Sequence, residues 1–599
     1  MLIQRQKITV AMQVVLIIVL IVLGFGVYLN SVNGGFIWDE EFLIKNNLHI
    51  KSWENIGIIF GESIGAGAKN NSNFYRPLQM LTYMADYSLW HLNAFGYHLT
   101  GIILHILVAL VLYWLIKMLF ADWALSLLTS ALFLVHPIQT ETVAYIAARA
   151  DLLGALFILL CLCLYIRQDS SRNKITFTLI LLSYILALLS KEYSLVLPLL
   201  IIMHSYIFKK KILKAEFVSV LGITFIYIIL RLTLLRFSLP EQDFMHTTTF
   251  LQRIPGFFVA LTEYYRLLLF PLNLHMEYMF RKFSMVDPRA ILGAIALAVL
   301  LVYAFKRGEK NKLVSFCILW FFVTLLPQSN LYPVNAYMSE HWLYLPSIGY
   351  FLALAYGLLM MHSVKKFRRL AVYLIALILF LYSFLTVKQN YYWKNAIGFW
   401  KKTLQYAPSN PRIYNNLCKA YMDIGEYEEA ISSCKKAVAL KPGYLTARYN
   451  LADSYKACGQ YENAAVEYKR IIEHNPRQEV AYFELGLLYE KSGDKEKAMD
   501  SYHKAIEIDH SYVEAYNNLA SIYAEKGQTD KAIGLWEKTV GIRPDFATGH
   551  FNLAVFYFRQ KKYDLAIYHC DKVIDSGNQV DPEFLGLLGP YRKKNVNRP

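Results

Sequence analysis

Two adjacent acidic residues, Asp39 and Glu40, follow the first apolar run of the chain, which covers residues 8–29. A carboxylate beside a membrane can take a proton from a hydroxyl group as that hydroxyl attacks a bound substrate. With two acids side by side, one can act as the base while the other orients a substrate or a divalent metal ion. The Trp-Asp-Glu triplet alone is equally compatible with a helix cap or a solvated loop.

Three basic residues at the ends of apolar runs could neutralise a phosphate group: Arg76, Arg149 and Lys191. Ionisable residues at membrane depth are costly, so they are candidates for function by default. A guanidinium or ammonium group binds phosphate through charge-assisted hydrogen bonds. Each of the three can instead form a structural ion pair. The acidic partners available for such pairs are Glu141, Asp151 and Glu192.

A second set of polar residues also flanks apolar runs. Glu340 and His341 could bind an acceptor or a metal ion, with Glu141 in a supporting role. A histidine at a membrane interface is, however, more often a hydrogen-bonding residue. His136 is a further supporting candidate, but it stands before Pro137 and can simply end its helix, because proline disfavours the helical conformation in the preceding residue.

The composition indicates which elements must hold these residues. Hydrophobic residues make up 56% of the 599 residues and charged residues only 18%, which is too apolar for an ordinary soluble protein. Much of the net charge of +16 lies in short clusters between apolar runs, such as residues 209–211 and 365–369. Clusters of this kind are typical of the cytoplasmic ends of membrane helices. We therefore expect contact with membrane lipid and no binding to nucleic acid.

Twelve apolar runs are candidates for membrane spans. The run at 254–271 is the weakest, because it contains two charged residues and ends at a proline. If this run is a re-entrant or surface helix and the N-terminus is cytoplasmic, the positive-inside rule places every basic cluster in the cytoplasm. The sequence then predicts eleven spans, with the chain leaving the membrane at residue 388 on the periplasmic or lumenal side. The external segments would be 30–97, 136–149 and 328–341.

The second part of the chain has a period of 34 residues. Glycine recurs at this period, and a lysine takes the fifth place. The residues are Gly425, Gly459, Gly493, Gly527 and Lys561. The pattern resembles the tetratricopeptide repeat, and we expect five units over residues 411–578. Such arrays stack into a superhelix whose concave face binds peptides or protein segments.

Asparagine precedes the recurring leucine in four of the units, at Asn416, Asn450, Asn518 and Asn552. Because its side chain has both a donor and an acceptor, a row at fixed spacing could hold the backbone of an extended peptide. Alternatively, asparagine is simply common at this position of such repeats. In the first unit, the cysteines at 418 and 434 could pair if the repeats lie outside the cytoplasm.

Several motifs in the membrane part resemble one known family when they are taken together. They are Phe36-Ile37-Trp38-Asp39-Glu40, Asn73-Phe74-Tyr75-Arg76-Pro77-Leu78, His136-Pro137-Ile138-Gln139-Thr140-Glu141 and Glu340-His341-Trp342-Leu343. In this order, and followed by repeats, they resemble the transmembrane O-mannosyltransferases that carry tetratricopeptide repeats, and their prokaryotic relatives. The resemblance covers nearly the whole chain.

The resemblance implies an inverting glycosyltransferase of the GT-C type that moves mannose from a polyprenyl-phosphate sugar to serine or threonine of a protein. It implies that Asp39 is the catalytic acidic residue and Glu40 its neighbour, where eukaryotic members commonly have two aspartates. The lipid carrier would be dolichyl phosphate in a eukaryote and undecaprenyl phosphate in a bacterium. A divalent metal is compatible with these motifs but is not specified by them.

We therefore expect an all-α protein. Its parts would be a polytopic GT-C-type membrane domain at 1–387, a junction with a partial repeat at 388–410, a superhelix of tetratricopeptide repeats at 411–578 and a C-terminal tail at 579–599. Two other hypotheses are a membrane-anchored scaffold without enzymatic activity and a transporter of a lipid-linked sugar. A plain anchor needs only one span, and no inverted repeat typical of transporters is apparent.

Overall fold

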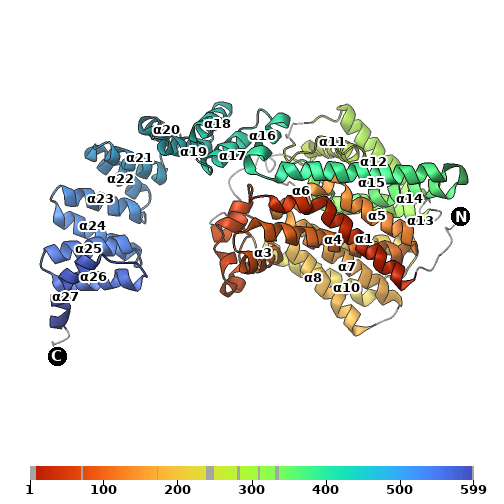
Figure 1. The fold of residues 1–599 in the computed structure, drawn as a ribbon, viewed down its shortest axis with the longest axis horizontal. Helices are drawn as coiled ribbons and strands as arrows, with labels where there is room; N and C mark the ends of the chain where they lie inside the picture. Colours follow the sequence, from red (N-terminus) through yellow and green to blue (C-terminus); the bar gives the residue numbers. More distant parts are fainter. Residues whose placement is uncertain are drawn as a thin grey trace. The chain divides into compact units, whose positions relative to one another are not determined.

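The computed structural model describes residues 9–68, 72–170, 173–237, 249–278, 283–307, 311–330 and 336–595. Every regular element in these ranges is a helix, which confirms the predicted all-α class. The chain divides into two compact units, Met1–Pro408 and Ser409–Pro599. Figure 1 colours the first unit from red to green and the second from teal to blue.

Within the described residues, six helical stretches of the first unit are long and apolar enough to cross a membrane. They contain α1 (Val10–Tyr28), α4 (Ala94–Phe120), α7 (Arg149–Ser170), α10 (Lys214–Leu232), α12 (Pro288–Arg307) and α15 (Arg368–Asn390). A bent pair, α5 (Trp123–Val135) and the segment Pro137–Ala144, gives a seventh candidate, with 56° between its halves. The bend falls at Pro137, because proline removes a backbone donor and clashes with the preceding turn.

Four shorter apolar helices belong to the same unit. They are α8 (Lys174–Ser190), α9 (Leu197–Phe208) with the turn before it, α13 (Lys312–Leu325) and α14 (Ser347–Ser363). The described residues thus contain six or seven segments long enough to cross a membrane and four shorter apolar helices, so the prediction of eleven spans stays a prediction. The helix α11 (Phe250–Leu269) is not among them, and that this run is re-entrant or lies at the surface stays a prediction.

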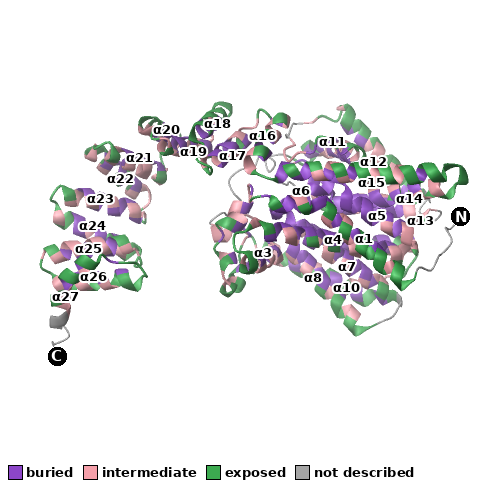
Figure 2. Cartoon of the chain, in the orientation of Figure 1, coloured by how far each residue is buried: buried purple, intermediate pink, exposed green. Residues whose placement is uncertain are grey.

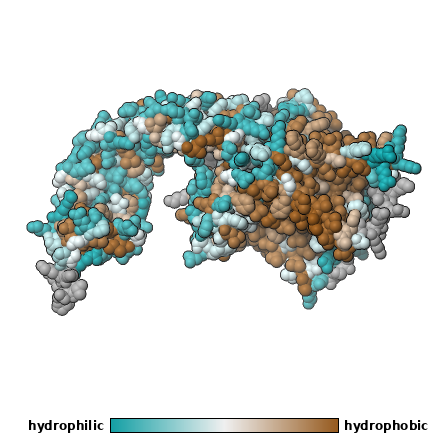
Figure 3. All heavy atoms as spheres, viewed as in Figure 1, coloured by the Kyte–Doolittle hydropathy of each residue, from teal (hydrophilic) through white to brown (hydrophobic). Residues whose placement is uncertain are grey.

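Inner and outer helices of this unit differ in how much of their apolar surface is covered. In the most apolar stretch of α7, 83% of the residues are buried, whereas the share is 17% in α10, α12 and α15 (Figure 2). The uncovered leucine, isoleucine and phenylalanine side chains form a broad apolar surface over this unit (Figure 3). An exposed apolar surface of this extent marks a membrane interaction site, and the first unit is a membrane protein.

Two basic connections between helices lie close together. The Lys210 ammonium is 2.8 Å from the Asp169 carboxylate, and the Gln168 side chain donates to Glu216 over 3.1 Å. The connections near 167–174 and 209–214 therefore share one end of the bundle, as the predicted topology requires. Arg149 is the first residue of α7, and Asp169 lies in the last turn of the same helix. The predicted phosphate ligand Arg149 and the basic connections therefore lie at opposite ends of α7.

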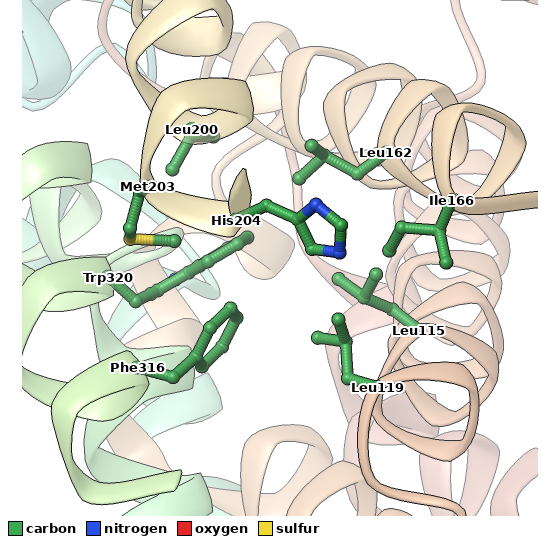
Figure 4. A pocket seen from close by; sticks show the side chains of 9 residues that line it. All are labelled: Leu115, Leu119, Leu162, Ile166, Leu200, Met203, His204, Phe316 and Trp320. Carbon is green, nitrogen blue, oxygen red and sulfur yellow. The ribbon is translucent and has the colours of Figure 1, made fainter. Parts of the chain in front are cut away.

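A small apolar pocket lies between α4, α7, α9 and α13 (Figure 4). His204 of α9 lies against it, together with Trp320 and Phe316 of α13. The pocket has a volume of about 10 Å³, which is close to the minimum for one water molecule. In the described part of the chain, Nδ1 of His204 has no hydrogen-bond partner. This pocket is too small for a substrate and belongs to the packing of the core.

The second unit consists of paired antiparallel helices. The pairs are α17 (Pro411–Met422) with α18 (Tyr427–Leu440), α19 (Leu445–Ala457) with α20 (Tyr461–His474), α21 (Glu479–Lys491) with α22 (Lys495–Ile508), α23 (Val513–Glu525) with α24 (Thr529–Ile542), and α25 (Ala547–Arg559) with α26 (Tyr563–Asp575). Each pair corresponds to one predicted repeat. The recurring alanines Ala430, Ala464, Ala498, Ala532 and Ala566 are all fully buried, because only a small side chain lets the paired helices approach closely.

The recurring glycines form the turn between the two helices of each pair. Gly425, Gly459, Gly493 and Gly527 have φ between +74° and +83°, a left-handed conformation that glycine adopts without steric cost. Lys561 takes the same place in the fifth repeat with φ +64°. A lysine there carries the strain that the other four repeats avoid.

Replacing Gly493 by alanine should destabilise its repeat by about 1–2 kcal/mol, because a Cβ is disfavoured in the left-handed conformation. Gly534 is the matched control, since it lies inside α24 and no atom is within 4 Å of a Cβ added there. Gly534→Ala should stabilise α24 by about 0.5–1 kcal/mol. Hydrogen exchange of residues 479–542 in the full-length protein measures both effects, and equal protection in the two variants would contradict this account.

The segments around the repeats are also helical. The helix α16 (Ala396–Tyr406), in the predicted junction 388–410, groups with the membrane unit, which extends to Pro408. The predicted tail at 579–599 contains α27 (Pro582–Asn595). Leu588 of α27 is fully buried in the core formed with α25 and α26, so α27 covers the apolar end of the last repeat.

Candidate active site

Asp39 lies in a turn that is held in an unusual backbone conformation. Trp38 has φ +51°, which is uncommon for a residue with a Cβ. The Asp39 side chain is only partly buried, and its Oδ2 accepts a hydrogen bond of 2.9 Å from the hydroxyl of Tyr145. Strained backbone that is fixed by its surroundings is frequent at functional sites. Here it presents a carboxylate with a defined orientation at the surface of the membrane unit.

The ring of Tyr145 is stacked between two tryptophans. Trp38 lies at 5.9 Å between ring centroids with 15° between planes, and Trp393 lies at 5.2 Å with 25°. Trp400 of α16 meets Trp38 edge to face at 5.7 Å. Because aromatic pairs restrict ring orientation, the stack fixes the Tyr145 hydroxyl and therefore the carboxylate of Asp39.

Glu40 has a different environment from Asp39. It is fully buried, and its two oxygens accept backbone N–H groups of Ile37 (2.7 Å), Ile146 (2.6 Å) and Ala147 (3.3 Å). Burial raises the pKa of Glu40 to about 8, although these three donors favour the ionised form. Glu40 therefore fastens the Asp39 turn to the short turn Ile146–Ala148 that precedes α7. It has no accessible oxygen for a substrate, so its role is to position its neighbour.

Arg149 is fully buried and forms an ion pair with Asp86 at 2.6 Å. The same nitrogen, Nη1, also donates to the Thr82 hydroxyl (3.2 Å), and Nη2 donates to the carbonyl of Tyr97 (2.9 Å). Both terminal nitrogens of Arg149 are thus directed at protein groups, so phosphate binding by Arg149 stays a prediction that would require breaking these contacts. The ion pair considered as the alternative is formed, but with Asp86 and not with Glu141, Asp151 or Glu192.

Lys191 and Arg76 form ion pairs with the predicted partners. The Lys191 ammonium is 2.5 Å from Asp151, and both side chains are buried, at 8% and 2% exposure. Phosphate binding by Lys191 would require breaking this pair. Arg76 is 3.4 Å from Glu192, with 15% and 30% of the side chains exposed. Of the three predicted phosphate ligands, Arg76 is therefore the most accessible.

Glu141 and His341, both predicted as acceptor-binding or supporting residues, are in direct contact, and that role stays a prediction. Glu141 accepts from the backbone N–H of His341 (2.9 Å), and its Oε1 is 2.8 Å from His341 Nδ1. Glu141 is buried, whereas 22% of the His341 side chain is exposed. Tyr145 and Glu141 are four residues apart, at the end and near the start of the short helix α6 (Thr140–Ala144). One helical turn thus connects the Asp39 contact to His341.

Glu340 is buried beside this pair and faces a loop that follows α11. Its Oε1 accepts hydrogen bonds of 2.6 Å from the backbone N–H of His275 and from the hydroxyl of Tyr278. Burial, reinforced by the charge of Glu141, raises the pKa of Glu340 well above its usual value. Glu340 therefore stabilises the loop and is shielded from a substrate.

His136 ends its helix, as the alternative prediction proposed. It is fully buried, its Nδ1 accepts from the backbone N–H of Ile138 at 3.2 Å, and its Nε2 is 3.2 Å from the carbonyl of Leu268. Both ring nitrogens thus contact backbone groups at the bend after α5. Among the described residues, no group of three or more histidine, cysteine, aspartate or glutamate side chains could hold a metal ion; a divalent metal stays a prediction.

The asparagine row in the repeats is partly used for contacts between repeats. Asn450 donates to Asn415 over 2.9 Å, and Asn552 donates to Asn517 over 3.1 Å, in each case across a repeat boundary. Asn518 donates to Tyr502 of its preceding repeat at 3.5 Å. Within the described residues, Asn416 Nδ2 is buried without a partner. The four amides therefore have unequal surroundings, and peptide binding by this row stays a prediction.

The two cysteines of the first repeat form a disulfide bond, Cys418–Cys434, between α17 and α18. A bond that closes a loop of this length contributes about 3 kcal/mol through the entropy of the unfolded chain. Cys418→Ser with Cys434→Ser should weaken the first repeat by about this amount, seen as faster hydrogen exchange at 411–440. Cys458→Ser is the control, since Cys458 is a free cysteine. Equal exchange with and without reductant in the wild type would contradict this prediction.

The sequence did not indicate several residues that shape the site: Asp86, Tyr145, Trp393 and Trp400. Tyr145 is 106 residues from Asp39 in sequence, and the tryptophans lie after the last membrane helix. Their only signal was that they stand in the polar segments that the predicted topology places on one side of the membrane.

Comparison with known proteins supports the division into two parts. Residues 425–486, 491–527 and 517–580 match family models for the tetratricopeptide repeat. Protein O-mannosyl-transferase F38B6.6 of Caenorhabditis elegans is 28% identical over 433 residues, which cover 69% of this chain and 61% of the relative. Protein O-mannosyl-transferase TMTC3 of Homo sapiens is 24% identical over 448 residues, which cover 67% of this chain and 49% of the relative.

The chain spans about half to three fifths of the length of these relatives. The matched length is more than twice that of the unit Ser409–Pro599, so the similarity includes the membrane unit. Among solved structures, the crystal structure of MamA is 32% identical over 25% of this chain and 88% of that chain, with a TM-score of 0.24. The chain is thus similar to the transmembrane protein O-mannosyl-transferases, and it carries tetratricopeptide repeats.

Proposed function

We propose that this chain is an integral-membrane glycosyltransferase of the GT-C type. It transfers a sugar, mannose or a close relative of it, from a polyprenyl-phosphate donor to a serine or threonine hydroxyl of a protein. The observation that carries the proposal is the geometry of Asp39, a partly exposed carboxylate fixed by Tyr145 in a turn that Glu40 fastens. The similarity to proteins named as O-mannosyl-transferases supports the same reaction.

Asp39 acts as the general base in this reaction. Its carboxylate takes the proton of the acceptor hydroxyl as the hydroxyl oxygen forms a bond to the anomeric carbon of the sugar. The bond between the anomeric carbon and the phosphate oxygen breaks, and polyprenyl phosphate leaves with the electron pair. Attack opposite the leaving group inverts the anomeric configuration. The hydrogen bond from Tyr145 keeps the carboxylate of Asp39 in place beside the incoming hydroxyl.

The repeats bind the polypeptide acceptor in this proposal, since superhelical repeat arrays present concave surfaces for peptides and proteins. We place the Asp39 turn and the repeats on the same, extracytoplasmic side of the membrane, with the N-terminus in the cytoplasm. The disulfide Cys418–Cys434 supports this orientation, because disulfides persist in the periplasm and the secretory lumen and are rare in the cytosol. The carrier is undecaprenyl phosphate or dolichyl phosphate, according to the cell in which the chain is made.

A transfer assay tests the proposal. The purified full-length protein in detergent is incubated with a panel of radiolabelled polyprenyl-phosphate sugars and a cell-envelope protein fraction. We expect label to enter protein from one donor, and the active donor identifies the sugar. Failure to transfer from every donor, together with failure to bind any of the lipids, would reject the enzyme and favour the scaffold. Binding and movement of donor across vesicles without transfer would favour the transporter.

A further inference from the structure

An apolar groove of about 580 Å³ lies on the outside of the membrane unit. Its walls are residues 269–272 after α11, one face of α14 and residues 378–385 of α15. The groove opens toward the lipid, because Phe270 is 64% exposed, Phe384 57% and Leu272 51%. Tyr350 and Tyr382 also line it, and Tyr382 packs edge to face on His136 with 4.4 Å between ring centroids. An apolar chain can enter such a groove from the bilayer without crossing water.

One end of the groove leads to polar groups. After Leu272 the chain continues to Leu274, whose carbonyl accepts a hydrogen bond of 3.2 Å from Gln389 at the end of α15. The Lys402 ammonium donates to the Gln389 side chain over 3.5 Å and lies 4.7 Å from the centre of the Tyr392 ring. Lys388, next to Gln389, is exposed. Two ammonium groups thus stand where the apolar walls end.

Lys388 and Lys402 are suited to binding an anion. Burial and the nearby charge of Lys388 lower the pKa of Lys402, whereas the charge of Glu340 raises it. An additional negative charge between the two lysines would offset their repulsion and keep both protonated. Charge-assisted hydrogen bonds between ammonium groups and phosphate are among the stronger polar contacts in proteins.

The same segment reaches the proposed base. Tyr392 precedes Trp393, which stacks on Tyr145, and the Tyr145 hydroxyl contacts Asp39. The groove, the two lysines and Asp39 are therefore connected through neighbouring side chains of the segment that leaves the membrane. A ligand with an apolar tail and a phosphate would bring the group attached to that phosphate toward Asp39.

We propose that the groove binds the prenyl chain of a polyprenyl-phosphate lipid and that Lys388 and Lys402 bind its phosphate. The inference rests on the proposed function and identifies where that function's donor binds. It differs from binding at Arg76, whose guanidinium is paired with Glu192. The charge complementarity of a single phosphate with two lysines, and the position of the groove beside the Asp39 stack, distinguish this occupant from the bulk lipid that covers the other outer helices.

Photo-crosslinking of the full-length protein tests this site. The probe is a polyprenyl phosphate, without sugar, that carries a benzophenone group on its chain. We expect crosslinks in residues 269–272 and 378–385, which competition by unlabelled polyprenyl phosphate removes and an equal amount of phosphatidylglycerol does not. Crosslinks at the ends of α3 (Pro77–Trp90) and α10, near Arg76, would overturn the proposal. Equal competition by phosphatidylglycerol would also overturn it and show a groove for ordinary lipid.

Substitutions separate the two halves of the site. Leu381→Trp should fill the groove and weaken binding of the probe about tenfold or more, whereas Leu377→Trp, on an exposed part of α15 outside the groove, should leave it unchanged. Lys388→Gln with Lys402→Gln should weaken binding about tenfold through loss of the phosphate contacts. Equal effects of Leu381→Trp and Leu377→Trp would contradict a specific chain site.

The outcomes also separate this inference from the proposed function. Crosslinking in the groove without sugar transfer from any donor would keep the lipid site and reject the enzyme. Sugar transfer from a polyprenyl donor, with crosslinks only near Arg76, would keep the enzyme and reject this site. Leu377→Trp should transfer sugar at the wild-type rate, which shows that an added tryptophan on α15 does not itself disturb the fold.

Discussion

Asp39→Asn should lower the rate of sugar transfer about one hundred to ten thousand fold, the usual contribution of a general base. The amide oxygen of asparagine can still accept the hydrogen bond from Tyr145, so the turn and the aromatic stack should be retained. The affinity for the lipid donor should change little, because Asp39 acts on the acceptor hydroxyl. The measurements are the transfer rate and the binding of polyprenyl phosphate to the same preparation.

Glu41→Gln is the matched control for this change. Glu41 is two residues further along the same turn, and its carboxylate is 3.5 Å from Lys45. Removing its charge should leave the transfer rate within about twofold, because its ion-pair partner Lys45 is 43% exposed and such pairs contribute little. Similar losses in Asp39→Asn and Glu41→Gln would show that the turn tolerates no loss of charge and would remove the argument for a base at Asp39.

Arg149→Met should destabilise the membrane unit by about 3–5 kcal/mol, because it leaves the buried Asp86 carboxylate without its partner. The double variant Arg149→Met with Asp86→Leu should recover most of this loss, since a buried ion pair can be replaced by apolar side chains. Thermal unfolding of the protein in detergent compares the three forms. The same comparison decides the role of Arg149 in the reaction.

If Arg149 is structural, the stable double variant should bind polyprenyl phosphate with wild-type affinity. If Arg149 instead contacts the donor phosphate, the double variant should be stable and bind the lipid poorly. Failure of the double variant to recover stability would show that the contacts of Arg149 with Thr82 and Tyr97 matter more than its charge balance with Asp86.

Much of the architecture could be predicted because it depends on local sequence patterns. The repeat period fixes the helix pairs, and the recurring glycines fix their turns, since a positive φ requires that residue type. The apolar helices of the membrane unit follow from hydrophobicity, whereas the number of spans and the role of residues 254–271 stay predictions. The disulfide could be anticipated because the two cysteines, 16 residues apart, lie on the two helices that pack together within one repeat.

The partners of the charged residues could not be predicted, because they depend on contacts between distant segments. Tyr145 meets Asp39 only because the bend at Pro137 returns α6 to the turn after α1. Arg149 has Asp86 as its partner although three other acids stand nearer to functional motifs in the sequence. The roles of Trp393 and Lys402 could not be predicted for the same reason, since nothing in the sequence of the junction at 388–410 indicates that it packs on the membrane unit.

The distinct roles of Asp39 and Glu40 show this limit most clearly. Apart from the family resemblance, the sequence presents two equivalent acids, and only the structure gives them different hydrogen bonds. Glu40 uses both oxygens on backbone N–H groups, whereas Asp39 remains partly exposed with one oxygen held by Tyr145. One acid is therefore suited to holding the turn and the other to receiving a proton.

The most direct test of the central claim is the chemical linkage of the transferred sugar. Purified wild-type protein and Asp39→Asn are each incubated with mannosyl polyprenyl phosphate and a serine- and threonine-containing polypeptide, and the products are analysed by mass spectrometry. We predict a hexose on serine or threonine, released by β-elimination, with the wild type alone. Hexose formed equally by both proteins, or found only on lipid or glycan, would contradict a protein O-glycosyltransferase that uses Asp39 as its base.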